Sequence, residues 1–255
     1  MSFHADGGNL KLGRGALFVA LWSGSTAPNA EHIGTFMGNV TSLELTQENE
    51  TREKYSSTEQ SSPLLDRRVV RQSYELVAAC DEHTLANLAL FMSGQQTTVA
   101  QSSGTGTTAT LNDVVLGDTY SLGARNVTSV VITGKVEGTD YLLDAEAGTI
   151  TILATGTITA ASDVAVTFNK PALTVNKIQG GLVSSPSARV TFIADDSNAD
   201  GDGSRDKLTV WKATVAPDGG YQFISDDYGS FSLRFSVVSD STNHPTEPFF
   251  THERV

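Results

Sequence analysis

The sequence predicts a mainly β protein with one flanking α-helix and a small β module inserted into its main domain. Apolar residues recur in short runs or in alternation with polar ones, which is the pattern of strands. Helical spacing of apolar residues occurs convincingly in one segment. The 23 glycines place turn signals between the runs.

Composition restricts the function. The 255 residues include 17 Lys and Arg against 29 Asp and Glu, a formal net charge of −12, which disfavours a protein that grips nucleic acid through a basic surface. One cysteine excludes an intramolecular disulfide. We expect no membrane insertion, because the apolar runs are far shorter than the ~20 residues a spanning helix needs. The N-terminus lacks the pattern of a signal peptide, so we expect a soluble chain made in a cytoplasm.

The first third predicts three strands and the helix. The run 16–22 is apolar throughout, as in a strand covered on both faces, and 35–46 is β-rich. In 67–80, one face of the expected strand carries Val70, Tyr74, Leu76, Ala78 and Cys80. The period then changes at Asp81, a candidate N-cap, and the helix is expected to end near Gly94.

Between the second and third strands, residues 47–66 lose all periodicity and carry many charges. The sequence therefore predicts a long loop here, of the kind that is usually functional or disordered. On its own this loop is expected to be mobile.

The chain is expected to divide into a first part of the main domain at 1–96, an inserted β module at 97–180, and a second part of the main domain at 181–255. The middle segment is rich in Thr and poor in charge, yet alternations such as Val164, Val166 and Phe168 favour strands over a disordered linker. Its flanks, QQTTVAQSSGTGTT and GGLVSSPS, have the composition of flexible linkers.

The last third predicts three strands with one polar face, over 188–194, 208–215 and 231–237, followed by an irregular tail after Asp240. Between the first two strands, Asp196, Asn198, Asp200 and Asp202 resemble the start of a calcium loop. Lys207 stands where a bidentate Glu belongs, so we favour a solvated acidic turn with no metal.

Catalytic patterns are not visible. The sequence contains no G-x-S-x-G elbow, no Walker A loop and no G-x-G-x-x-G, and its five histidines are far apart. We therefore expect no enzymatic activity and no cofactor.

The order of these segments resembles the major tail tube protein of long-tailed, siphovirus-type bacteriophages. The resemblance rests on GNVTSLELTQE with its charged loop, DRRVVRQSYELVAACDE running into HTLANLALFMSG, and the block GSFSLRFSVVSDSTNHPTEPFF. It covers roughly 14–96 and 186–255. The middle segment, with GTDYLLDAEAGTITI leading to VAVTF, is similar to small Ig-like modules of phage structural proteins.

The resemblance implies a tail-tube-like β-sandwich that closes into rings, with six subunits expected, which stack into a tube through which the genome is delivered. Its partners would be further copies of itself and the tape measure, tail tip and tail terminator proteins. DNA would pass without sequence-specific binding. The protein would be located in the virion tail after assembly in the host cytoplasm.

In the resembled family, a long loop at the position of 47–66 reaches a neighbouring subunit. The candidate contact residues are basic or apolar side chains in and beside this loop, since charges steer association and apolar groups anchor it. They are Arg52, Lys54, Tyr55, Leu64, Leu65, Arg67 and Arg68.

A second interpretation belongs to another class. A secreted or surface β-sandwich, similar to an adhesin or pilus subunit, would bind carbohydrate or protein and use the acidic loop for calcium. That function would require a secretion signal. A hydrolase with a polar pocket is a third hypothesis.

Overall fold

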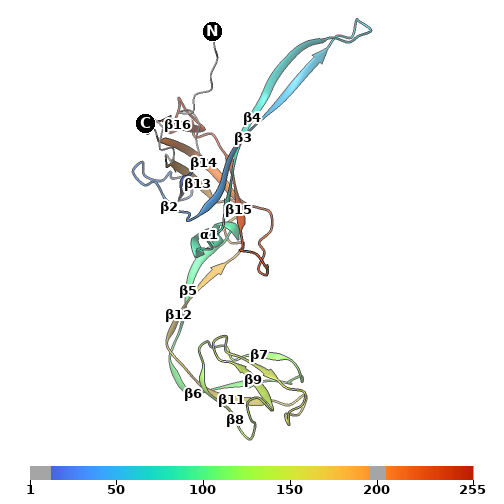
Figure 1. Ribbon diagram of the computed structural model, residues 1–255, viewed down its shortest axis with the longest axis vertical. Helices are drawn as coiled ribbons and strands as arrows, with labels where there is room; N and C mark the ends of the chain where they lie inside the picture. Colours follow the sequence, from blue (N-terminus) through green and yellow to red (C-terminus); the bar gives the residue numbers. More distant parts are fainter. Residues whose placement is uncertain (1–12, 196–204, 255) are drawn as a thin grey trace, which may run out of the picture. The chain divides into compact units, whose positions relative to one another are not determined.

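The computed structural model describes residues 13–195 and 205–254 (Figure 1). The chain forms two compact units, one of Met1–Gln96 with Ile178–Val255 and one of Thr97–Lys177. The sequence interpretation placed the second boundary at 180. The described residues contain sixteen strands and one helix, so the mainly β class with a single helix is confirmed.

The larger unit is built on one antiparallel eight-stranded sheet. Seven strands follow the order β2-β1-β13-β14-β15-β4-β3, and β16 pairs with β14 beside this path. The strands are β1 (Gly15–Leu21), β2 (Thr35–Phe36), β3 (Val40–Tyr55), β4 (Leu64–Cys80), β13 (Ser187–Ala194), β14 (Asp206–Asp218), β15 (Phe231–Val237) and β16 (Phe250–Arg254).

One face of this sheet carries the core of the larger unit. Alternate residues of β15, Phe231, Leu233 and Phe235, are at most 2% exposed, while Arg234 between them points to solvent. Val190 of β13 and Leu76 of β4 join the same cluster. The three predicted strands of the last third are therefore present. β15 has the predicted exposed polar face, whereas Arg189 and Thr191 of β13 and Thr209 of β14 are buried on the face opposite the core.

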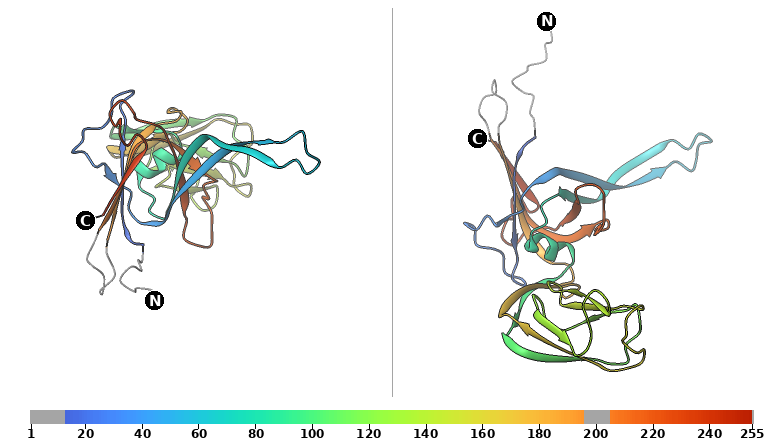
Figure 2. Two further views of the ribbon diagram at one scale, coloured as in Figure 1. Left: turned by 90° about the horizontal axis from the view of Figure 1, so that it is seen from above. Right: turned by 60° about the horizontal axis from the view of Figure 1, so that its bottom comes forward.

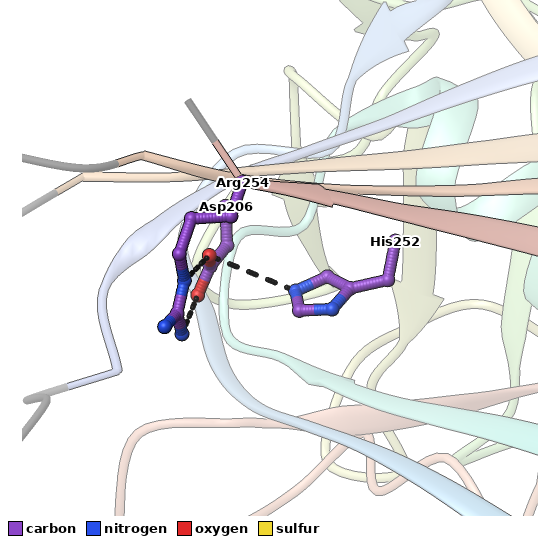
Figure 3. A network of polar contacts seen from close by, with 3 residues as sticks. All are labelled: Asp206, His252 and Arg254. Atoms are coloured by element: carbon purple, nitrogen blue, oxygen red, sulfur yellow. Dashed lines mark hydrogen bonds and ion pairs between the residues drawn. The ribbon is translucent and has the colours of Figure 1, made fainter. Parts of the chain in front are cut away.

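β16 lies in the tail that the sequence predicted to be irregular. Its register pairs Asp206 with Arg254 and Leu208 with His252 across β14. The Arg254 guanidinium donates through Nε to Oδ1 of Asp206 at 2.8 Å, and Nε2 of His252 lies 3.7 Å from the same oxygen (Figure 3). Pro245 and Pro248 precede this strand and led to the prediction of an irregular tail. A proline restricts the backbone only at itself and at the residue before it, so a strand can follow.

The helix α1 (Leu85–Phe91) packs on the core through Phe91. Its N-cap is Thr84, whose hydroxyl accepts from the backbone N of Asn87, and the prediction of Asp81 was wrong. The Asp81 carboxylate instead accepts hydrogen bonds from Nδ2 of Asn39, the residue that directly precedes β3. The helix ends at Phe91 with Met92 as its C-cap, two residues before the predicted Gly94.

The smaller unit contains two three-stranded antiparallel sheets around a common core. One sheet has the order β7-β10-β9 and the other β6-β11-β8. Their strands are β6 (Gly104–Leu111), β7 (Thr119–Ser121), β8 (Thr128–Ile132), β9 (Tyr141–Asp144), β10 (Thr149–Ile152) and β11 (Val164–Lys170). Ile150 and Ile152 of the first sheet and Val166 and Phe168 of the second are at most 1% exposed. These are residues of the β-type alternations in the sequence.

The first segment predicted as a flexible linker, 95–108, is mostly strand, whereas the second, 180–187, contains no strand residue before β13 begins at Ser187. β5 (Gln95–Gln101) and β12 (Leu173–Gln179) pair with each other and carry the chain across both boundaries of the smaller unit. Residues 104–108, also assigned to the first linker, belong to β6. Their Thr and Gln side chains suit an exposed ladder, which composition alone did not distinguish from a linker.

Candidate interaction arm

The segment predicted as a loop is a β-hairpin. β3 and β4 pair continuously from Val40 with Cys80 to Tyr55 with Leu64. Figures 1 and 2 show the distal part of this hairpin projecting from the larger unit. We call residues 47–73 the arm. The prediction of a loop over 47–66 was wrong for 47–55 and 64–66, which belong to paired strands that hydrophobic periodicity did not reveal. The mobility of this segment stays a prediction.

The larger unit leaves both sides of the arm uncovered. Every arm residue is exposed except Ser56, whose backbone N donates to the carbonyl of Pro63 to close the terminal turn. The covered part of the hairpin begins near its base, where Leu76 is 1% exposed. The arm is thus a two-stranded ribbon with no core of its own.

One face of the arm is almost wholly charged. Residues opposite each other in an antiparallel ladder share a face. Glu50 and Arg71 form one such pair, with Nη1 and Oε2 3.2 Å apart. Arg52 faces Arg68, whose Nε donates to Asp66 at 2.9 Å.

The opposite face combines charges with apolar side chains. Arg67 lies 2.8 Å from Glu53, its ladder partner. The hydroxyl of Tyr55 donates to the same carboxylate at 2.5 Å, and this hydrogen bond and the carboxylate's charge raise the pKa of Tyr55. Val69 lies on this face and is 59% exposed.

The tip gathers the apolar residues. Tyr55 is 54% exposed and its partner Leu64 48%. Leu65 is the extra residue at a shift of register between Lys54 and Tyr55, and it is 62% exposed. Three large side chains that remain in water at the end of a ribbon are candidate anchors for another surface.

All seven contact residues proposed from the sequence lie on the arm: Arg52, Lys54 and Tyr55 on β3, and Leu64, Leu65, Arg67 and Arg68 on β4. The sequence analysis missed Glu50, Glu53, Val69 and Arg71, which share the two faces with them. The sequence did carry one signal for these residues, namely opposite charges at positions that pair in a hairpin. That signal is usable only once the register is known.

The internal interactions of the arm are weak. Exposed ion pairs such as Arg71 with Glu50 contribute about 0 to 1 kcal/mol each. An isolated two-stranded hairpin is marginally stable in water at best. The contacts within the arm therefore contribute little to its stability.

The candidate calcium ligands Asp196, Asn198, Asp200 and Asp202 lie outside the described residues. Their neighbour Lys207 is described and forms an ion pair with Glu253 at 3.5 Å. Among residues 13–195 and 205–254, no three His, Cys, Asp or Glu side chains are grouped as for a metal ion. No helix in the same ranges is long and apolar enough to cross a membrane.

Fold and arm together define a mainly β protein with an exposed β-hairpin arm. The chain matches the family model described as Protein of unknown function UCP028589 over residues 11–249, and it belongs to this family. The match includes both compact units and the arm. No curated protein matches the chain significantly.

Proposed function

We propose that the protein is a structural subunit of the virion, which polymerises as stacked six-membered rings into the tail tube of a long-tailed bacteriophage. The observation that carries the proposal is the arm, an ordered ribbon that its own unit leaves uncovered. Ring closure and stacking would give this ribbon a partner surface in every subunit, as repeated contacts in a closed assembly do.

The charges support the same assignment. The arm holds five basic and five acidic side chains, so the rest of the chain carries the entire net charge of −12. Acidic bodies repel one another, and a charge-balanced arm is the element best suited to approach an acidic neighbour. An acidic body would also let DNA pass through a tube without holding its phosphates.

The proposal includes partners and location. Copies of the same chain would be the main partners, with the tape measure, tail tip and tail terminator proteins at the ends of the tube. The protein would be assembled in the host cytoplasm and would reside in the tail of the virion.

Electron microscopy of negatively stained, purified protein tests the proposal. We expect rings or tubes from the natural chain. In a shortened variant, Asn-Gly replaces residues 51–70 and joins Glu50 to Arg71, which face each other in the ladder. This variant should retain its circular dichroism and cooperative melting but lose stacking.

The matched control replaces exposed aliphatic residues away from the arm. Val131 and Leu142 of the smaller unit are 55% and 51% exposed, similar to the apolar residues of the arm tip. Val131→Ser with Leu142→Ser should leave tubes unchanged. Normal tubes from the shortened variant would refute the role of the arm, and a monomer under all conditions would refute the tube.

A surface β-sandwich that binds carbohydrate or protein is the second candidate. The smaller unit favours it, because its two three-stranded sheets around one core have the architecture of a small binding module. The same microscopy separates the two, since this candidate predicts dispersed particles whether or not the arm is present.

A further inference from the structure

Arg189 is the one buried cation among the described residues, with 7% of its surface exposed. It lies on β13 on the face of the sheet opposite the core. Its Nη2 donates to the backbone carbonyls of Asn29 and His32, which ties the segment between β1 and β2 to this face. Within residues 13–195 and 205–254, its Nε and Nη1 groups have no hydrogen-bond partner and no carboxylate lies within ion-pair distance.

A buried guanidinium with no anionic partner among the described residues is unusual, because removal of a charge from water is costly unless a counter-charge compensates. Burial lowers the pKa of Arg189, although a guanidinium remains protonated at neutral pH. The two carbonyl acceptors bind only Nη2, which is one of the three nitrogens of the guanidinium. The remaining donors are therefore available to a ligand.

An open cavity of about 460 Å³ lies beside this group. Thr191 and Thr209, paired across β13 and β14, contribute to its floor and are 2% and 5% exposed. Trp211 forms a wall and stacks on His244, with ring centroids 3.6 Å apart. The cavity thus combines hydroxyl groups, an aromatic wall and a guanidinium, all on regular elements of the larger unit except the histidine.

The other charges of the cavity are already engaged. Lys207 lies 3.5 Å from Glu253. Both oxygens of the Asp240 carboxylate accept from Nδ2 of Asn243. Asp240 nevertheless places a negative charge in the lining, which opposes a dianion such as phosphate more strongly than a monoanion. A planar carboxylate also matches the two-pronged geometry of a guanidinium.

We propose that this cavity, the Arg189 pocket, binds a carboxylate group through the free donors of Arg189. The carboxylate has two possible sources, a small organic acid or an Asp or Glu side chain of a second copy of this chain. The inference does not rest on the proposed function, because binding is measured on the dispersed protein.

The test uses acetate as the probe and the fluorescence of Trp211 as the readout. Trp22→Phe leaves Trp211 as the single tryptophan of the chain. Acetate should then change the fluorescence saturably, whereas sodium chloride at the same ionic strength should not. Arg189→Lys keeps the charge but loses the forked geometry, and it should weaken acetate binding by about tenfold or more.

A second variant separates binding from folding. Asp240→Asn removes the negative charge from the lining and should strengthen acetate binding several-fold, an effect that damage to the fold would not produce. The matched control, Arg125→Met, removes a guanidinium from the other compact unit and should change nothing. No saturable response to acetate, or unchanged affinity in Arg189→Lys, would overturn the proposal.

Sedimentation velocity distinguishes the two sources. If the carboxylate belongs to a second copy, acetate will dissociate the assemblies of the natural chain, and Arg189→Lys will assemble less. If it belongs to a small acid, acetate will bind without any change in sedimentation. If the natural chain forms no tubes but binds acetate as expected, the result contradicts the proposed function and still supports the carboxylate site in the Arg189 pocket.

Discussion

Cys80 is a buried thiol at the end of β4, with 0% of its surface exposed. Burial raises its pKa to about 11, with a smaller contribution from the charge of Asp81. The thiolate is the reactive form. At pH 8 the native thiol should therefore react with Ellman's reagent at least about 100-fold more slowly than an ordinary cysteine. In urea one thiol per chain should react rapidly, and fast reaction of the folded protein would contradict this assignment.

Asp140 organises the loop region of the smaller unit. Its carboxylate accepts from the backbone N and the hydroxyl of Thr157, at 2.6 and 2.8 Å, and from the backbone N of Val136 at 2.8 Å. These hydrogen bonds lower the pKa of Asp140, the bond from the Thr157 backbone most of all. A lowered pKa means that the stabilisation is present above the unfolded value, near 4, and is lost as the pH falls through the folded value.

We expect hydrogen exchange around residues 136–158 to accelerate as the pH falls below about 4, after correction for intrinsic exchange rates. Asp140→Asn should accelerate it already at neutral pH, because an amide replaces one acceptor oxygen with a donor. The exposed Asp163→Asn is the control. Equal protection in Asp140→Asn and the natural chain at neutral pH would show that this carboxylate does not stabilise the unit.

At the scale of elements, two basic side chains of the arm differ from its other cations. Arg52 and Lys54 have no ion-pair partner within the described residues, although Arg67, Arg68 and Arg71 each have one. If the arm approaches an acidic neighbour, these two side chains are the ones free to pair with it.

Arg52→Glu with Lys54→Glu should therefore raise the protein concentration needed for assembly by about tenfold or more, with the melting temperature almost unchanged. The control, Arg125→Glu with Lys177→Glu, makes the same change of charge in the smaller unit. Light scattering during a concentration series measures both. Equal assembly of the two double variants would exclude a role for the arm charges.

The same arm explains why sequence analysis succeeded elsewhere and failed there. Alternation detects a strand with one buried face, such as β15, where Phe231, Leu233 and Phe235 enter the core. A strand with both faces exposed to solvent has no such alternation of apolar and polar residues. In 47–55, residues such as Glu50 and Asn49 also have low strand propensity, so the pairing partner alone reveals the structure. The sequence placed the candidate contact residues on this segment without predicting its hairpin conformation, and their contacts stay a prediction.

The helix shows the opposite case. Its apolar stripe and its approximate end could be predicted from the sequence, because both depend on the spacing of residues within the helix itself. The N-cap was not, because Asp81 and Thr84 are both good caps and a distant residue, Asn39, engages the first of them. The Arg189 pocket was equally hidden, since its lining residues come from four separate stretches of the chain.

For the whole molecule, the two compact units have separate cores. The core of the smaller unit includes Val114, Ile150 and Phe168, and that of the larger unit includes none of its residues. We expect a chain in which a short Gly/Ser linker joins Gln96 to Ile178 to fold cooperatively and to form the same rings. Calorimetry and microscopy check this expectation. Insoluble or unfolded protein would show that the larger unit depends on the smaller one.

Chain entry and exit at this boundary are adjacent. β5 and β12 run antiparallel as neighbours, and a Cβ placed on Gly94 would lie 2.8 Å from the carbonyl oxygen of Gln179. At the level of the gene, a single insertion at this boundary adds a whole module, and a single deletion removes it. Neither event alters the order of the surrounding strands. The same position is a natural place for a genetic fusion, and a foreign domain whose termini lie close together would be displayed once on every subunit.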